Sequence, residues 1–310
     1  RLKFTMKDKF TQSVQATIAR LALPASYQRA VERVVCALAA EISNRHQAMG
    51  RPIVIGLNGT QGSGKSTVSE FLKLSLELLH GLPTAVMSLD DIYLSKPARE
   101  QLALKVHPLL KTRGVPGTHH VSLGIETIDS LLSASEKNST LLPGFDKSVD
   151  DVLPLSSWRQ FQGRAQVVIL EGWCVAARAQ SERALLEPVN TLELNEDRRG
   201  VWRNYVNTQL ESQYPSLFNK IDFTVMLKAP DFECVFGWRL LQEQKLRAQM
   251  KSLGRGGERN QGLLDEAGLK YFLMHYERLT RFMLTDLPSW VDAVIPVTRD
   301  HRLLDLELRR

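Results

Sequence analysis

The sequence contains three cysteines and no long apolar run among its 310 residues. The cysteines, Cys36, Cys174 and Cys234, lie far apart and lack the spacing of metal ligands, so we expect no disulfide framework and no cysteine metal site. No uninterrupted apolar stretch is long enough to cross a bilayer, and the first residues do not form the apolar segment of a secretory signal. These absences favour a cytoplasmic protein with no membrane partner.

The sequence also lacks a strong excess of one charge. Its 40 Lys and Arg residues stand against 34 Asp and Glu residues, which gives a formal net charge of +6, and the basic residues are dispersed. A nucleic-acid-binding protein would normally concentrate positive charge and interleave it with aromatic residues. We therefore expect no nucleic-acid partner, and the modest positive charge fits an anionic small substrate.

A glycine-rich loop at residues 59–66 fits the pattern G-x-x-x-x-G-K-[ST]. An apolar run at residues 52–57 precedes it and predicts a buried strand, whereas apolar residues at helical spacing follow it between positions 68 and 79. Between a strand and a helix, such glycines let backbone N–H groups turn inward, and the helix N-terminus adds positive potential. The pattern predicts a site for a nucleoside triphosphate.

Two side chains of this loop have expected roles of their own. The Lys65 ammonium would reach the β- and γ-phosphates, and the Ser66 hydroxyl would bind Mg²⁺. The residues expected to bind the nucleotide are Gly59, Thr60, Gln61, Gly62, Ser63, Gly64, Lys65, Ser66 and Thr67.

Alternation of strand and helix patterns predicts an α/β fold. Further strand candidates, short and rich in β-branched residues, are residues 84–89, 166–170, 223–229 and 293–297. Helical segments separate several of them, which favours a parallel sheet covered by helices on both faces. Residues 1–50, with a predicted helix at 27–48, are expected to form an N-terminal helical extension to a domain at 51–310.

Two segments of the predicted domain are longer than the connection needed between two parallel strands. Residues 91–165 contain five prolines and one helix candidate, at 122–132, and we expect this insertion to build a substrate site rather than a surface excursion. In the last third, predicted helices at 231–250 and 265–284 flank a glycine- and arginine-rich connection, and residues 235–262 are expected to form a lid. The second of these helices carries an apolar stripe that we interpret as core packing. Its members are Leu269, Phe272, Tyr276, Leu279 and Met283.

Asp90 follows the second predicted strand directly. In open α/β sheets, ligands lie outside the carboxyl ends of the strands, so Asp90 is expected to face the phosphate loop from a neighbouring strand. A carboxylate there could accept the proton of an attacking hydroxyl or bind a magnesium-bound water. The structural alternative is that Asp90 or Asp91 caps the turn that follows.

Glu171 ends the apolar run at residues 167–170. An acid at this carboxyl edge has the position expected of the carboxylate that supports Mg²⁺ in a P-loop enzyme. Burying it would be costly without a cation or hydrogen bonds. We predict Ser66 and Glu171 as the magnesium-site residues.

A turn at residues 113–120 lies within the insertion and reads Arg-Gly-Val-Pro-Gly-Thr-His-His. It would present Arg113, Thr118, His119 and His120, and an arginine there could bind a carboxylate or phosphate in a forked geometry. No third ligand stands at a convincing spacing from the histidine pair, so zinc is not expected. A purely structural turn is the alternative.

Two further segments carry weaker signals. The turn at residues 143–148 carries Asp146 and Lys147 close to the end of the insertion. Arg239, after Gly237 and Trp238, could neutralise charge in a phosphoryl-transfer transition state, whereas a solvated helix face would explain most basic residues of this helix equally well.

Taken together, these segments resemble a known family. The runs Leu-Asp-Asp-Ile-Tyr-Leu-Ser at 89–95, the turn at 113–120, Phe-Asp-Lys-Ser at 145–148, Leu-Glu-Gly-Trp at 170–173 and Trp-Arg-Leu at 238–240 are similar to plant-type D-glycerate 3-kinase and its microbial relatives. That family belongs with uridine kinase, pantothenate kinase and phosphoribulokinase in one group of P-loop kinases. The similar segments run in order between about residues 51 and 300.

The resemblance implies a P-loop NTPase fold with a parallel five-stranded sheet, a lid, and transfer of the γ-phosphoryl group of ATP to a small-molecule hydroxyl. It places Asp90 at the position of the base and Glu171 near magnesium. One departure matters: plant-type sequences have Asp where this chain has His120. This difference weakens a nucleoside acceptor and leaves glycerate itself open.

The sequence therefore predicts a kinase dependent on ATP and Mg²⁺ whose leading acceptor is D-glycerate, an anionic hydroxy acid. Catalytic candidates are Lys65, Asp90 and Arg239, and acceptor-site candidates are Asp90, Tyr93, Arg113, Thr118, His119, His120, Asp146 and Lys147. The alternatives are a P-loop kinase for pantothenate, a sugar phosphate or a nucleoside, and a nucleotide-binding regulatory or assembly ATPase.

Overall fold

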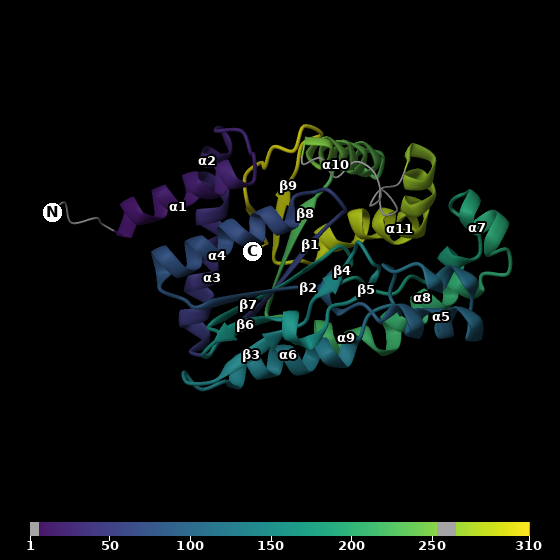
Figure 1. Ribbon diagram of the computed structural model, residues 1–310, viewed down its shortest axis with the longest axis horizontal. Helices are drawn as coiled ribbons and strands as arrows, with labels where there is room; N and C mark the ends of the chain where they lie inside the picture. Colours follow the sequence, from purple (N-terminus) through teal and green to yellow (C-terminus); the bar gives the residue numbers. More distant parts are fainter. Residues whose placement is uncertain (1–5, 253–264, 310) are drawn as a thin grey trace.

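A twisted central sheet organises the computed structural model, which describes residues 6–252 and 265–309 (Figure 1). The strand order is β10-β9-β8-β1-β7-β2. The bounds are β1 (Ile53–Gly59), β2 (Thr84–Ser88), β7 (Val167–Gly172), β8 (Phe223–Lys228), β9 (Ala293–Pro296) and β10 (Glu307–Leu308). The first five of these pair in parallel, which confirms the expected five-stranded parallel sheet, and β10 adds a short antiparallel edge that was not predicted.

One expected neighbour relation is wrong. Asp90 was expected at the end of a strand next to the phosphate loop, but β7 lies between β1 and β2. Ser88 at the end of β2 pairs with Glu171 of β7, and Leu57 of β1 pairs with Glu171 from the other side. Glu171 therefore lies between the carboxyl ends of β1 and β2.

Alternate residues of the buried strands enter two separate hydrophobic clusters. Ile53, Ile55 and Leu57 of β1 pack into the first cluster, whereas Val54 packs into the second. This two-residue period follows from strand geometry, and burial on both faces explains the continuous apolar runs in the sequence. Each fully buried aliphatic side chain contributes on the order of 2 kcal/mol of transfer free energy.

Helices cover both faces of the sheet, as predicted (Figure 1). The first cluster contains side chains from α1 (Met6–Arg20), η1 (Val31–Val35), α3 (Cys36–Met49) and α4 (Lys65–His80). The second contains side chains from α6 (Val121–Ser133), α8 (Val201–Ser212), α9 (Tyr214–Phe218) and α11 (Glu266–Asp286). Residues 6–49 thus share a hydrophobic cluster with the sheet.

Several helices differ from the predicted ranges. The helix expected at 27–48 consists of α2 (Tyr27–Ala30), a π-helical segment η1, and α3. Helix α1 was not predicted, although Phe10, Val14 and Ile18 pack into the first cluster. The other elements not predicted between β7 and β8 are η5 (Glu182–Leu185), α7 (Thr191–Glu196), α8 and α9.

The insertion contains short elements rather than a compact subdomain. They are η2 (Leu89–Ile92), α5 (Lys96–Lys105), η3 (Pro108–Lys111), α6, β3 (Ser139–Leu142), β4 (Phe145–Asp146), β5 (Asp151–Val152), η4 (Leu155–Ser157) and β6 (Arg159–Gln162). Strands β3 and β6 form one two-stranded sheet, and β4 and β5 form another. The predicted helix at 122–132 is α6.

The last third contains α10 (Glu233–Ser252), α11, η7 (Leu287–Ser289) and the edge strands. Residues 235–252 of the predicted lid lie in α10, whereas its remainder and the glycine- and arginine-rich connection at 254–259 lie outside the described residues. Within residues 6–252 and 265–309, no helix combines the length and apolar character needed to span a membrane.

Candidate active site

A cavity of about 410 Å³ opens at the carboxyl ends of β1, β7 and β2. It is lined by sequence-predicted residues from the phosphate loop, both strand ends, the insertion and α10: Gln61, Gly62, Lys65, Ser66, Asp90, Tyr93, Arg113, Lys147, Glu171 and Arg239. The position agrees with the rule that ligands of open α/β sheets bind beyond the strand carboxyl ends. The cavity joins the predicted phosphate end to the predicted acceptor end.

The loop between β1 and α4 has the backbone of a phosphate cradle. Gly62 and Gly64 have φ of +77° and +91°, a region in which side chains with a Cβ are strained. A Cβ on Gly62 would also lie 2.8 Å from the Trp238 Cβ, so α10 packs directly against the loop. Helix α4 begins at Lys65, and its N-terminus therefore adds positive potential at the cavity.

Two oxygen-bearing side chains meet behind this loop. The Ser66 hydroxyl donates a hydrogen bond to Glu171 Oε1 at 3.0 Å. Glu171 is 6% exposed at the end of β7 and lines the cavity. Hydroxyl and carboxylate oxygens are ligands that Mg²⁺ accepts, so this pair could hold the ion together with phosphate oxygens and water.

Lys65 is enclosed close to both carboxylates of the site. Its Nζ donates to the Thr60 carbonyl at 3.1 Å. Burial lowers the pKa of Lys65, and the negative charges of Glu171 and Asp90 offset only part of that effect. The ammonium is thus a poorly solvated cation directed by the loop, as contact with a phosphate requires.

Asp90 accepts hydrogen bonds on both carboxylate oxygens. The Tyr93 hydroxyl donates to Oδ1 at 2.7 Å, and Lys147 Nζ donates to Oδ2 at 2.5 Å. Burial alone would raise the pKa of Asp90, but the charge and hydrogen bond of Lys147, the Tyr93 hydrogen bond and the Lys65 charge together hold that pKa below its ordinary value. Asp90 is therefore ionised and able to accept a proton once one partner is displaced.

The neighbouring acid behaves differently. Burial raises the pKa of Asp91 to about 6, and the charge of Arg159, whose Nη2 lies 3.6 Å from Asp91 Oδ2, offsets part of the rise. Divergent pKa values of adjacent carboxyl groups are typical of sites that perform acid–base chemistry. The turn itself is capped by Ser88, whose hydroxyl accepts from Asp90 N, so neither acid supplies the expected cap.

Two cations mark the acceptor end of the cavity. Lys147 comes from the turn between β4 and β5 and pairs with Asp90. Arg113 comes from the turn before α6 and pairs with Asp150 of the same β4–β5 hairpin. On the lid side, Arg239 Nη1 donates to Gln242 Oε1 at 2.6 Å, and both residues line the cavity.

Four predicted acceptor residues do not line this cavity. Thr118 is fully buried, and its hydroxyl bonds to the Val115 carbonyl and the Gly114 N–H within the turn. His120 is exposed and caps α6, because its Nδ1 accepts from Leu123 N at 3.2 Å. The Thr118 and His120 side chains form hydrogen bonds with nearby backbone groups instead of facing the cavity.

His119 and Asp146 are likewise turned away. His119 stacks on Tyr93 at 4.7 Å between ring centroids, and its Nδ1 lies 2.5 Å from the Tyr214 hydroxyl. Asp146 Oδ1 accepts from Ser148 N and Oγ at the hairpin turn. His119 therefore supports Tyr93 from behind, and Asp146 shapes the turn that carries Lys147.

The buried His119 predicts a specific acid sensitivity. Burial lowers the pKa of His119 to about 3, against about 6.5 in an unfolded chain. Below pH 6.5 the unfolded state binds a proton that the folded state does not, so stability falls as pH decreases from 6.5 toward 3. We expect the free energy of unfolding of the wild type to fall about 1.4 kcal/mol more per pH unit in this window than that of His119→Gln. Denaturant titrations at pH 6.5, 5.5 and 4.5 measure both slopes, and equal slopes would contradict the expectation.

Five residues that line the cavity were not predicted from the sequence, namely Ser88, Trp173, Gln242, Phe272 and Tyr276, and the role of Asp91 was left open. Tyr276 was interpreted as part of an apolar stripe, and it does pack against the Trp173 ring with centroids 4.8 Å apart. Its hydroxyl also donates to the Arg113 carbonyl at 3.0 Å, while Trp173 Nε1 donates to the Gly114 carbonyl at 2.8 Å. The polar tips of these rings were the available signal, because buried Tyr and Trp usually find a partner.

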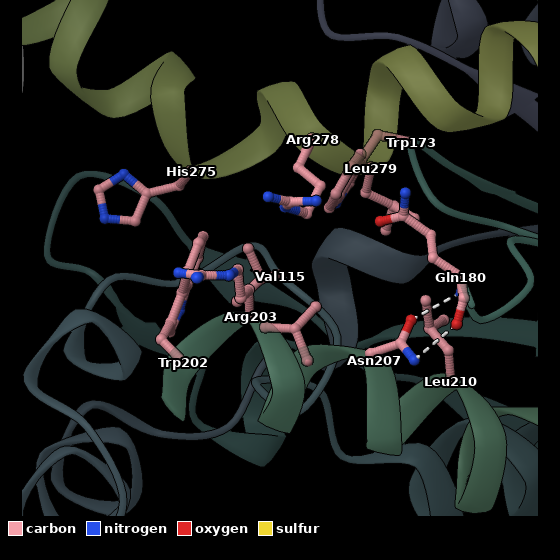
Figure 2. A pocket seen from close by; sticks show the side chains of 11 residues that line it. Val115, Trp173, Gln180, Trp202, Arg203, Asn207, Leu210, His275, Arg278 and Leu279 are labelled. Carbon is pink, nitrogen blue, oxygen red and sulfur yellow. Dashed lines mark hydrogen bonds between the residues drawn. The ribbon is translucent and has the colours of Figure 1, made fainter. Parts of the chain in front are cut away.

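A second pocket, lined in part by Trp173, lies between α8 and α11 (Figure 2). Its volume is about 20 Å³, room for about one water molecule. Its Arg278 makes a bidentate ion pair with Glu193 of α7 at 2.8 and 2.6 Å, and Asn207 exchanges hydrogen bonds with the backbone of Gln180 (Figure 2). This pocket is too small for a substrate, so the larger cavity is the candidate active site.

Known proteins share this sequence and fold, although no family model matches the chain. The chain is 32% identical over 257 residues to the uncharacterized kinase mug58 of Schizosaccharomyces pombe, covering 78% of this chain and 84% of that protein. It is 29% identical over 206 residues to the chloroplastic D-glycerate 3-kinase of Arabidopsis thaliana, covering 63% of this chain and 42% of that protein. The structure of D-glycerate 3-kinase from Cryptococcus neoformans var. grubii matches with a TM-score of 0.73 and 26% identity, over 92% of this chain and 100% of that one.

The fold is that of a P-loop kinase, and the identity to the fission yeast kinase extends over most of both chains. The chain therefore belongs to the family of P-loop kinases that contains plant-type D-glycerate 3-kinase and its microbial relatives.

Proposed function

We propose that the protein transfers the γ-phosphoryl group of ATP, in the presence of Mg²⁺, to a hydroxyl of D-glycerate. The observation that carries the proposal is one cavity lined by Lys65, the Ser66–Glu171 pair, the Asp90–Lys147 pair and Arg113. The D-glycerate 3-kinases among the relatives support the choice of acceptor.

The residues at the phosphate end fit ATP and Mg²⁺. Gly62 and Gly64 leave the loop backbone open to phosphate oxygens, and Ser66 and Glu171 offer hard oxygen ligands for the ion. When bound, ATP would supply the transferable phosphoryl group, and Mg²⁺ would supply a positive charge that offsets the negative charge developing on that group. Lys65 would hold the phosphates, and Arg239 of α10, which lines the same cavity, would also approach them.

At the acceptor end, Asp90 would orient the hydroxyl and accept its proton. Tyr93 is 4% exposed and fixed by its stacking on His119, so it keeps its hydrogen bond to Oδ1. Lys147 comes from an exposed turn, and its side chain is 57% exposed. The acceptor hydroxyl would therefore replace Lys147 at Oδ2, and the departing proton would go to that oxygen.

The two cations suit an acceptor that carries a carboxylate. Lys147 and Arg113 both line the cavity, and the Arg113 guanidinium can bind a carboxylate through two parallel hydrogen bonds. A neutral nucleoside would leave both cations unused, which makes an anionic hydroxy acid the better candidate. Closure over the acceptor would also exclude water and limit ATP hydrolysis.

A panel of acceptors tests the proposal. ADP release from ATP and Mg²⁺ would be measured by a coupled assay with D-glycerate, pantothenate, ribulose 5-phosphate or uridine, and with no acceptor. The proposal predicts the largest kcat/KM with D-glycerate. A larger value with another acceptor would identify a different kinase, and ATP binding without acceptor-stimulated ADP release would favour a regulatory or assembly ATPase.

A further inference from the structure

The β4–β5 hairpin connects both cations of the acceptor end. Its turn carries Lys147, which pairs with Asp90, and Asp150, which pairs with Arg113. The hairpin lies beside η2, the segment that carries Asp90. One four-residue turn therefore touches the predicted base and the predicted carboxylate-binding arginine at the same time.

Asp150 is held firmly on the side away from Arg113. Arg99 Nη2 lies 3.0 Å from Asp150 Oδ2 and donates to the Asp150 carbonyl at 2.7 Å. Arg99 is 1% exposed, and its other donors bond to the carbonyls of Leu94 and Lys111. Asp150 also has φ of +57°, a left-handed conformation that a non-glycine residue adopts only where its surroundings fix it.

Arg113 depends on this fixed carboxylate for its own position. Asp150 Oδ1 accepts from Arg113 Nη1, and the guanidinium carbon lies 5.5 Å from the centroid of the Phe145 ring. An arginine side chain loses rotamer entropy when it is fixed. A guanidinium that is already held by Asp150 and Phe145 would lose less of this freedom when a ligand binds.

We propose that Asp150 is the positioning residue for acceptor specificity: anchored by Arg99, it fixes the Arg113 guanidinium so that it binds the carboxylate of the acceptor. The inference rests on the proposed function, because it concerns the same cavity and an anionic hydroxy acid. It adds a residue outside the cavity lining, in a ladder Arg99–Asp150–Arg113 that ends at the acceptor.

Charge and geometry make opposite predictions for removal of Asp150. If Asp150 only competed with the acceptor for Arg113, its removal would leave the guanidinium less neutralised, and anionic acceptors would bind more tightly. If Asp150 positions Arg113, its removal weakens a charged, forked hydrogen bond, a contact typically equivalent to about a tenfold change in affinity or more. The sign of the change in KM therefore decides between the two.

The test compares Asp150→Asn with the wild type on D-glycerate and on its neutral methyl ester. We expect the KM for D-glycerate to rise about tenfold, while kcat and the KM for ATP change little. The preference for D-glycerate over the ester should fall by a similar factor. Asp151→Asn is the matched control, because Asp151 Oδ1 caps Lys96 N and does not contact Arg113. An unchanged or lower KM for D-glycerate in Asp150→Asn would overturn the inference.

A double-mutant cycle separates positioning from a structural effect. In an Arg113→Gln background, Asp150→Asn should raise the KM for D-glycerate by less than twofold, because the residue through which it acts is absent. Full additivity would overturn the inference. If Asp150→Asn fails to fold because Arg99 loses its partner, Arg113→Lys provides the test, since it keeps both the positive charge and the Arg99–Asp150 pair. A wild-type KM for D-glycerate in Arg113→Lys would overturn the inference equally. A wild type without turnover on D-glycerate would instead refute the proposed function, and this inference with it.

Discussion

Asp90→Asn should lower kcat about 10²- to 10⁴-fold, the range expected for loss of a general base. Asn has the shape of Asp and can still accept from the Tyr93 hydroxyl, so the variant should fold normally. It cannot take up the proton of the acceptor hydroxyl. Because the phosphate loop and the Ser66–Glu171 pair are untouched, the affinity for ATP should remain within a few-fold of the wild type.

Steady-state kinetics with D-glycerate and a direct ATP-binding titration measure the two quantities. Asp91→Asn provides the matched control, since it removes a carboxyl group one residue further on that faces Arg159. Its effect on kcat should be at least about tenfold smaller than that of Asp90→Asn. Near-normal turnover of Asp90→Asn would end its assignment as the base.

Lys65→Met should reduce kcat by about 10²- to 10³-fold, as expected when a preorganised charge that stabilises the transition state is removed. It should also weaken ATP binding, since the ammonium is expected to contact the phosphates in the ground state as well. The stability of Lys65→Met, in contrast to its activity, should not fall. Burial lowers the pKa of Lys65, which means that the folded protein holds this cation at a cost, so Met should leave the melting temperature unchanged or raise it.

Activity, ATP affinity and thermal melting of Lys65→Met would be compared with those of Lys73→Met. Lys73 lies on the same helix, 38% exposed and paired with Glu77 at 3.4 Å, so its loss should affect none of the three by much. Wild-type kcat in Lys65→Met, or a large loss of stability alone, would show that Lys65 has a structural role.

The sequence predicted those parts of the site that local chemistry determines. A buried strand, a loop with glycines at left-handed positions and a helix start are contiguous in the chain, so the phosphate cradle needed no knowledge of tertiary structure. Asp90 lies just beyond the end of one strand and Glu171 lies in the last residues of another, and parallel strands bring their carboxyl ends to one edge.

The order of the strands in the sheet and the directions of the side chains could not be predicted from the sequence in the same way. Strand β7 enters between β1 and β2 from residues more than 70 positions after β2, a choice made by long-range packing. In the turn at 113–120, only Arg113 lines the cavity, because Thr118 and His120 satisfy backbone groups and His119 packs against Tyr214. The apolar spacing of α11 predicted packing for Tyr276, but it could not show that another part of the residue borders the cavity.

The most direct test of the account follows the γ-phosphoryl group itself. ATP labelled at the γ-phosphorus would be incubated with the protein, Mg²⁺ and D-glycerate, and the label would be divided between phosphorylated acceptor and inorganic phosphate. A site that joins the phosphate loop to Asp90 in one cavity, and that closes over the acceptor, predicts that nearly all the label is found on the acceptor. Label recovered as inorganic phosphate, at a rate indifferent to D-glycerate, would contradict it.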